Sequence, residues 1–213
     1  KENLIDKNNQ LAFPTPCLKI GVITAEGSAA WKDFSTLIET TPYNIKLIPV
    51  WTKMQGNKTR GEVCRAIEQL DQTVDVICLI RGGGGKTDLV FFDSEDICRS
   101  IANCKTPVLT GIGHQIDEAI ADLVSWKSFY TPTHLSQFII EQVENELKSL
   151  TELQRQLRSQ TEARFRQAKQ ILLQSSKDIS NLTHNKILLE EERLRSKFQK
   201  ISSPRGFYIQ GQF

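Results

Sequence analysis

Apolar and polar positions follow two different patterns along this chain, and the change between them falls near residue 133. Before it, short apolar runs alternate with segments in which apolar residues recur every three or four positions, which indicates strands alternating with helices. After it, only the helical spacing continues. The pattern predicts an α/β domain at residues 1–132 with a lead-in linker at 1–17, a helical arm at 133–203 and a C-terminal tail at 204–213.

The first part of the chain contains four apolar runs of strand length, each followed by a helical segment, in the order β-α-β-α-β-α-β-α, the last helix without assigned bounds. The predicted strands cover residues 18–24, 44–50, 74–80 and 107–110, and the predicted helices cover 29–40, 59–70 and 94–103. Gly27-Ser28 and Ser94 stand where turns or helix caps are expected. Such alternation favours a Rossmann-like, mostly parallel sheet with right-handed crossovers. The loops that follow the strands should then gather at one edge, where α/β folds bind ligands.

Residues 133–203 contain neither Gly nor Pro and are rich in Leu, Gln, Glu, Lys and Arg, which is typical of a long helix. Their apolar residues keep imperfect heptad spacing and so predict a coiled-coil seam. The seam consists of Val143, Leu147, Leu150, Leu157, Ile179, Leu182, Leu189, Leu194, Phe198 and Ile201. The polar stretch 174–181 interrupts it and favours the tip of an antiparallel hairpin, with a continuous or kinked helix as the alternative. An apolar seam needs a partner, and we expect the arm to pair with itself, with another copy or with a small helical subunit, giving a homo- or hetero-oligomer.

Composition narrows the class of protein. Hydrophobic residues make up 39% of the chain and charged residues 24%, as in average soluble globular proteins. No apolar run approaches the roughly 20 residues of a membrane span, so we expect a cytoplasmic protein without a membrane partner. The net charge of +2 at pH 7 leaves nucleic acid open as a ligand, because a local cluster of cations and backbone N–H groups can hold phosphates in one cleft.

Five cysteines form an odd set without a C-x-x-C pair, which argues against both a disulfide framework and a zinc site. They are Cys17, Cys64, Cys78, Cys98 and Cys104. We interpret all five as reduced packing residues, and Cys78, which lies inside an apolar run, as a core residue.

A run of four glycines, Gly82, Gly83, Gly84 and Gly85, directly follows the third predicted strand. Glycines carry no Cβ to keep a phosphate away from backbone N–H donors, so the run predicts an anion site. Arg81 adds a permanent, forked cation that can grip two phosphate oxygens. The alternative is a flexible turn with a solvent-facing arginine, although an ordinary turn needs only one or two glycines. A P-loop is excluded, because the spacing G-x-x-x-x-G-K-[ST] is absent.

The loop after the fourth predicted strand carries His114, with Asp117 three positions later. If a helix begins there, Asp117 can orient His114 and stabilise its protonated form for proton transfer at a phosphodiester oxygen. A structural or merely exposed histidine is the alternative, but the two preceding glycines and the strand-end position favour function. Asp122, further on, is interpreted as a salt-bridge partner on a helix face. Asp33 approaches the same edge from the first predicted helix, although acids on helix surfaces are common.

Three stretches of this sequence resemble the signature stretches of the exonuclease VII large-subunit family, in order and at similar separations. They are IGVITAEGSAAWKDF, LIRGGGGKTDLVFFDSE, and GIGHQIDEAIADLV followed by TPT. The similarity begins near residue 4 and continues through Thr133, while the arm is similar in kind and not residue by residue. The family's amino-terminal OB-fold is not contained in this sequence, and its usual coiled coil is longer.

The resemblance implies a catalytic set of Asp33, Arg81, His114 and Asp117, each of which matches an essential position of the family. It also implies single-stranded DNA as the substrate, degraded from its ends to short oligonucleotides, and exonuclease VII small subunits docked along the arm. Activity without strict dependence on a metal is implied as well. A divalent cation such as Mg²⁺ stays possible as an aid to Asp33, although isolated carboxylates fall short of the acid-rich cluster of two-metal nucleases.

The sequence departs from the family at several neighbouring positions. The departures are Gly85 in place of Ser, Thr87 in place of an acid, Gln115 in place of Glu, and Ser128 and Tyr130 in place of Arg and Pro. They affect expected secondary contacts with DNA and leave the catalytic set intact.

Two functions are therefore in competition. The first is hydrolysis of DNA phosphodiesters by the catalytic set, with the glycine amides stabilising charge on the phosphoryl oxygens. The second is a non-catalytic phosphate- or nucleotide-binding scaffold subunit with a coiled-coil arm. Both use the glycine loop, and they differ in whether His114 is needed for turnover or dispensable for binding.

Overall fold

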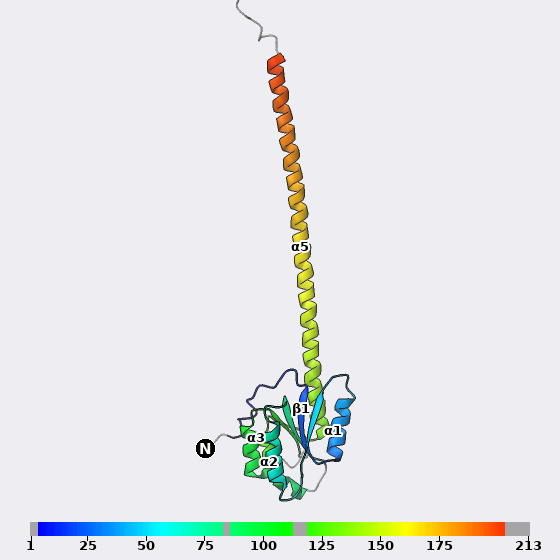
Figure 1. The fold of residues 1–213 in the computed structure, drawn as a ribbon, viewed down its shortest axis with the longest axis vertical. Coiled ribbons are helices and arrows are strands. Elements are labelled where there is room, and N and C mark those ends of the chain that lie inside the picture. The colour runs from blue at the N-terminus through cyan, green and yellow to red at the C-terminus, as the bar shows by residue number, and fades with distance from the viewer. Residues whose placement is uncertain (1–3, 83–85, 113–118, 203–213) are drawn as a thin grey trace, which may run out of the picture. The chain divides into compact units, whose positions relative to one another are not determined.

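The computed structural model describes residues 4–82, 86–112 and 119–202. The chain forms two compact units, Lys1–Leu150 and Thr151–Phe213. The first holds a sheet and its helices, and the described part of the second is a single helix (Figure 1).

The first unit is built on a five-stranded sheet in the order β2-β1-β3-β4-β5, in which every neighbouring pair is parallel. The strands are β1 (Lys19–Thr24), β2 (Lys46–Trp51), β3 (Val76–Ile80), β4 (Val108–Gly111) and β5 (Lys127–Ser128). The helices are α1 (Ala29–Glu39), α2 (Thr59–Leu70), α3 (Glu95–Asn103), α4 (Ile120–Val124) and α5 (Pro132–Ser202), and a 3₁₀ segment, η1, covers Lys86–Asp93. The predicted fold class, a parallel α/β sheet followed by a long helix, is confirmed.

Two short elements escaped the sequence analysis, because neither carries a long enough periodic pattern. Strand β5 has two residues, and η1 lies in a segment that reads as loop. The helix expected after the fourth strand is found as α4, with five residues. Asp122, interpreted above as a salt-bridge partner on a helix face, lies buried in the first turn of α4. There its Oδ2 accepts a hydrogen bond from the Ala119 backbone N–H at 3.2 Å, so it acts at the helix start.

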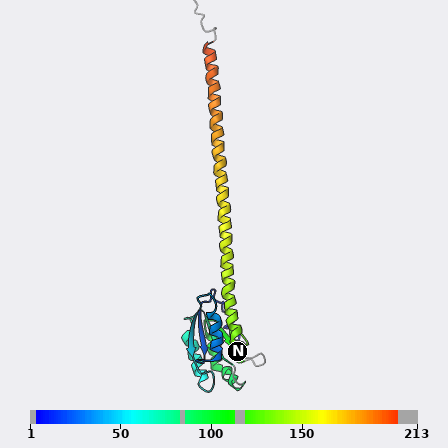
Figure 2. The same ribbon diagram turned by 90° about the vertical axis from the view of Figure 1, so that its right-hand side faces the viewer.

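The core lies on both faces of the sheet. On one face, Phe34 of α1 and Leu135 of α5 pack with Ile20, Val22 and other side chains of the central strands. The first turns of α5 lie beside α1 in both views of the molecule (Figures 1 and 2). On the opposite face, side chains of α2, α3 and α4 pack against the strands. Both faces are covered, as in doubly wound α/β folds.

The segment before β1 has a larger role than a lead-in linker. Asn8 is fully buried and hydrogen-bonds to backbone groups in the last turn of α3, between α3 and β4, and at the first residue of β4. Phe13 packs on Trp126 with ring centroids 4.8 Å apart, and the Trp126 indole N–H donates to the Leu11 carbonyl at 2.9 Å. The segment is therefore an integral part of the α/β unit.

Helix α5 is continuous through residues 174–181, so the hairpin favoured above is wrong and the continuous helix is found. Ser, Asn and Asp lower helix propensity by well under about 1 kcal/mol each, and no Gly or Pro is present to end the helix. Gln174 also supports the helix across the polar stretch, since its side-chain amide donates to Asp178 at 2.9 Å. Among the described residues, no helix is both long and apolar enough to cross a membrane.

The first turns of α5 belong to the α/β core. Leu135 and Ile139 are fully buried and Val143 is 3% exposed. Val143, assigned above to the coiled-coil seam, is therefore a core residue, whereas Leu147 and Leu150 beyond it are about half exposed. The spacing is the same for a core face and for a seam, so the pattern alone does not separate them.

All five cysteines are free, and four of them are buried. Burial raises the pKa of Cys17 and Cys104 to about 12 and that of Cys98 to about 11, and it raises the pKa of the fully buried Cys78 well above its ordinary value. Thiols with such pKa values are protonated and unreactive near neutral pH. The interpretation of these four as packing residues agrees with their burial.

Candidate active site

The candidate site lies at the carboxyl edge of the sheet, at the point between β1 and β3 where the strand order reverses. Strand β1 is followed by α1 and β2 on one side, whereas β3 lies on the other side of β1. The loops after β1 and β3 therefore diverge, and such a switch point is where open α/β sheets form a ligand crevice. Arg81 is the first residue after β3, and Ser28 closes the loop after β1.

Arg81 is held firmly at this edge. Its backbone N–H donates to the Gly111 carbonyl at 3.2 Å, which ties the end of β3 to the end of β4. Its side chain is largely enclosed, because the residue is only 7% exposed. A solvent-facing arginine on a flexible turn, the alternative considered above, does not match this burial. A largely desolvated guanidinium interacts more strongly with an anion than an exposed one does.

Asp33 and Arg81 line one cavity of about 230 Å³. Asp33 projects from α1 and is exposed, and Gly82, Ile112 and the segment 130–133 complete the wall. Gly82 lies against the first turn of α1, since a Cβ added to it would lie 3.5 Å from the Ala30 nitrogen. The structure thus brings together a carboxylate and a guanidinium that are 48 positions apart (81 − 33) in the sequence.

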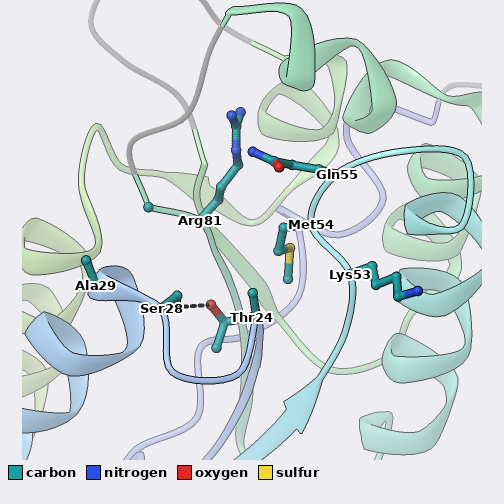
Figure 3. A pocket seen from close by; sticks show the side chains of 9 residues that line it. Thr24, Ser28, Ala29, Lys53, Met54, Gln55 and Arg81 are labelled. Atoms are coloured by element: carbon teal, nitrogen blue, oxygen red, sulfur yellow. Dashed lines mark hydrogen bonds between the residues drawn. The ribbon is translucent and has the colours of Figure 1, made fainter.

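A second cavity, of about 440 Å³, shares Arg81 and Gly82 with the first. Thr24, Ser28, Lys53 and Gln55 contribute polar groups to its wall. Figure 3 shows the Arg81 side chain reaching into this space, with the Gln55 amide pointing toward it and the Lys53 chain extending the other way. Arg81 therefore stands between two hollows and can bridge groups bound in each.

The first turn of α1 is fixed by its cap. Ser28 Oγ accepts a hydrogen bond from the Trp31 backbone N–H at 3.1 Å and lies 3.3 Å from Thr24 Oγ1, which links the cap to the end of β1 (Figure 3). Gly27 has a φ of +65°, a conformation that favours glycine. The turn and cap predicted at Gly27-Ser28 are confirmed, and they set the direction in which α1 presents Asp33.

The other predicted site residues lie outside the described part of the chain. These are Gly83, Gly84, Gly85, His114 and Asp117. The described residue nearest before His114 is Ile112, which is buried and lines the cavity of Asp33 and Arg81. Ile112 precedes His114 by two positions in the sequence.

Several wall residues were missed by sequence reasoning. Lys53 and Gln55 lie in the loop after β2, so the strand-end rule that selected the other loops also applies to them. They belong to no motif and follow no glycine run, which is why they were passed over. Tyr130, noted only as a departure from the family, lines the Asp33 cavity and is half exposed.

Within the described residues, no group of three or more His, Cys, Asp and Glu side chains is placed to hold a metal ion. Asp33 is the one carboxylate among the described wall residues of the two cavities. What these residues offer is a desolvated cation, the backbone N–H of Gly82, and an acid nearby. That combination suits an anion whose charge rises during reaction, as at phosphorus.

The described residues form a doubly wound α/β unit, and the candidate site lined by Asp33 and Arg81 lies at its switch point. A family model described as "Exonuclease VII, large subunit" matches residues 4–205. The chain therefore belongs to the exonuclease VII large-subunit family, which confirms the resemblance noted in the sequence.

Individual relatives agree with this assignment. The exodeoxyribonuclease 7 large subunit of Acaryochloris marina is 37% identical over 141 residues, which are 65% of this chain and 34% of the relative. The protein of the same name from Pseudothermotoga lettingae is 29% identical over 218 residues, covering 95% of this chain and 56% of the relative. That of Thermotoga maritima is 38% identical over 123 residues, or 57% and 31%. The chain thus matches between about a third and just over half of the length of these curated relatives.

Proposed function

We propose that this chain is a catalytic subunit that hydrolyses phosphodiester bonds of single-stranded DNA from its ends, releasing short oligonucleotides. The observation that carries the proposal is the single cavity at the switch point that Asp33 and Arg81 both line, in a chain of the exonuclease VII large-subunit family. The relatives' names, exodeoxyribonuclease 7 large subunit, support the same reaction class.

Each residue of the predicted set takes one task in this reaction. Arg81 and the amides of the glycine run stabilise the charge that develops on the phosphoryl oxygens as water adds to phosphorus and the ester P–O bond breaks. Asp33 positions or activates that water. His114 transfers the proton at the phosphodiester oxygen, and Asp117 orients His114.

The proposed reaction has no strict need for a metal cofactor. Asp33 can act on water directly, and a divalent cation such as Mg²⁺ bound at Asp33 would supply a Lewis acid in addition. Activity in excess chelator separates the two cases. Undiminished turnover supports the direct role, and loss that added Mg²⁺ restores supports the cation.

The enzyme assay uses end-labelled single-stranded and double-stranded DNA, with and without chelator. Single-stranded DNA should be shortened from its ends, and His114→Ala should abolish turnover while leaving affinity for DNA intact. The chain has three histidines, so His184→Ala on the exposed face of α5 is a matched control that should retain full activity. If the chain binds DNA without shortening it, and His114→Ala binds equally well, the non-catalytic scaffold is the better description.

We further propose that the arm from residue 150 onward pairs with helical partners, namely exonuclease VII small subunits or another copy of this chain. Between residues 151 and 200, every side chain of α5 is exposed, including Ile179, Leu182 and Leu189 at 62 to 69%. An apolar stripe of this kind on a single helix is stable in water only when a second helix covers it. The proposed substrate and partners are cytoplasmic, and we place the protein there.

Sedimentation measures whether the chain assembles through its arm. Leu150→Asp and Leu189→Asp each put a carboxylate into the stripe, and assembly should weaken by orders of magnitude because burying the charge costs several kcal/mol. Ser159→Asp adds the same charge at a position away from the stripe and should assemble normally. A wild-type chain that stays monomeric with and without the small subunit would contradict the partner proposal.

A further inference from the structure

We propose that Trp31 and Trp51 form a platform on which one base of a single-stranded nucleic acid stacks, next to the candidate active site. The inference rests on the proposed function, and it adds a base-binding subsite outside the catalytic set. Neither tryptophan is needed for the chemistry described above. Both lie at the carboxyl edge, Trp31 in the first turn of α1 and Trp51 as the last residue of β2.

The two rings come together from neighbouring elements. Trp51 pairs in register with Thr24 of β1, and the ring centroids of Trp31 and Trp51 are 5.2 Å apart at an interplanar angle of 88°. In such an edge-to-face pair the edge of one ring meets the face of the other, so at most one ring face is used by the pair itself. Trp31 supports Trp51 in a fixed orientation and leaves indole surface for a third ring.

Trp51 keeps unusual exposure for a side chain of its size. It is 41% exposed, although tryptophan is on average highly buried. Trp51 also contributes, with Thr52 and with Arg65 of α2, to the wall of a surface hollow of about 370 Å³. If the two tryptophans only packed at the edge of the sheet, burying the exposed part of Trp51 would stabilise the fold, because each exposed Å² of apolar area costs about 25 cal/mol.

The pair adjoins the cavity that a phosphate would enter. Trp31 donates its backbone N–H to Ser28, which lines the cavity of about 440 Å³, and Lys53 of the same wall follows Trp51 by two positions. A strand whose phosphate is held at Arg81 can thus pass Lys53 with a neighbouring base beside Trp51. Alternating cations and aromatic rings are how proteins hold single strands without sequence preference.

The platform selects for single strands. Bases in a duplex already stack on each other on both faces, whereas an unpaired base has a free π-face for an indole. The subsite therefore supplies a physical reason for strand preference that the phosphate-binding residues do not supply, since phosphates are common to both forms.

The decisive experiment compares an intact single-stranded oligonucleotide with an abasic one of the same length, which has the phosphates but no bases. Affinities are measured on the full chain in a His114→Ala background, so that the strand is not degraded. Trp51→Ala should raise the Kd for the intact strand about 5- to 150-fold, the usual worth of one stacked base. It should leave the Kd for the abasic strand unchanged.

Conservative variants distinguish the loss of stacking from misfolding. Trp51→Phe keeps a ring and should retain most of the affinity, whereas Trp51→Leu keeps apolar bulk without a ring and should behave like Trp51→Ala. Phe165→Ala removes an aromatic side chain that is 73% exposed on α5 and serves as the matched control without effect.

Tryptophan fluorescence provides a second test of base stacking. The chain has three tryptophans, so a Trp126→Phe background reports only Trp31 and Trp51. The intact strand should quench this emission by direct stacking, and the abasic strand should not.

Failure of the platform and failure of the proposed hydrolysis are distinguishable. If Trp51→Ala or Trp51→Leu binds the intact strand as tightly as the parent, or loses equal affinity for both strands, the platform is overturned whatever the nuclease assay shows. If the chain with His114 shortens no DNA but the base-dependent loss at Trp51 persists, the platform stands and the hydrolytic function falls.

Discussion

Asn8 and Asp71 lie at the amino edge of the parallel sheet, and Asp33 and Arg81 lie at its carboxyl edge. Asn8 is fully buried, with its amide nitrogen 3.1 to 3.3 Å from three backbone carbonyls and its oxygen accepting from the Val108 N–H at 2.9 Å. At the opposite edge the polar side chains line open cavities instead. One edge joins strands and helices together, and the other leaves room for a ligand.

Asp71 shows the same use of polar groups at the amino edge. Its Oδ1 lies within hydrogen-bond distance of the Cys104 thiol, the Lys105 N–H, and both the N–H and hydroxyl of Thr106, at 2.9 to 3.2 Å. These bonds connect the end of α2 to the segment that enters β4. Polar residues at this edge stabilise the fold, because they hydrogen-bond to other groups of the protein.

Structural and functional polar residues in this fold differ in where their hydrogen-bond partners come from. A buried polar group with every partner supplied by the chain predicts a loss of stability on mutation. A polar group in the wall of a cavity at the switch point predicts a loss of binding or turnover with little change in stability.

The largest effect is expected for Arg81→Lys. Lysine keeps the charge but loses the fork that holds two phosphate oxygens, so turnover should fall by roughly 10² or more while binding falls far less. The measurement is the hydrolysis rate on end-labelled single-stranded DNA beside the Kd and the melting temperature. Arg99→Lys, on the exposed face of α3, is the matched control. A near-normal rate for Arg81→Lys would remove Arg81 from the catalytic set.

Asn8→Ala should produce the largest loss of stability at the amino edge. It removes the partner of three carbonyls and one N–H that stay buried, and a cost of about 2 kcal/mol or more in the free energy of unfolding is expected. Urea unfolding measures it, with the exposed neighbour Asn9→Ala as control. At temperatures where the variant is folded, its turnover should be normal. Stability equal to that of the control would contradict the structural role of Asn8.

The sequence predicted the elements well where a local pattern is strong. Helix α2 has the predicted bounds, and β1, α1 and α3 begin within one residue of prediction. The strand-end rule also placed Asp33 and Arg81 at one edge, and they line one cavity. The role of Asn8 was hidden, because its partners lie 93 to 100 positions away and its own neighbourhood is plainly polar. Likewise, heptad spacing did not reveal that Val143 joins the core and Leu150 does not.

Asp71→Asn should have a smaller, pH-dependent effect. Burial opposes ionisation of Asp71, but the hydrogen bonds from Cys104, Thr106 and Lys105 outweigh it and lower the pKa of the carboxyl. A lowered native pKa adds stability above the unfolded-state value of about 4, and that stability is lost as pH falls through the native pKa. The amide variant should therefore lose about 1 kcal/mol at neutral pH and show a shallower loss of stability below pH 4.

Unfolding curves between acidic and neutral pH measure this difference. Glu68→Gln neutralises an exposed acid on α2 and is the matched control. Parallel pH profiles for Asp71→Asn and the wild type would contradict the assignment of Asp71 as an ionised acceptor.

The smallest effect is a change in thiol labelling, which reports on the amino edge locally. In the native protein near neutral pH, a maleimide should react first with the partly buried Cys64, because burial raises the pKa of the other four thiols and shields them. All five should react after unfolding.

Asn8→Ala loosens the contacts of the Cys104 and Thr106 carbonyls, so it should speed labelling of Cys104 more than that of Cys78 in the central strand. Peptide mapping identifies the labelled cysteine. Arg81→Lys acts at the opposite edge and should leave the rate at Cys104 unchanged. Equal acceleration at Cys104 and Cys78 in the Asn8 variant would mean global unfolding, and acceleration at Cys104 by Arg81→Lys would mean that the two edges are not separate.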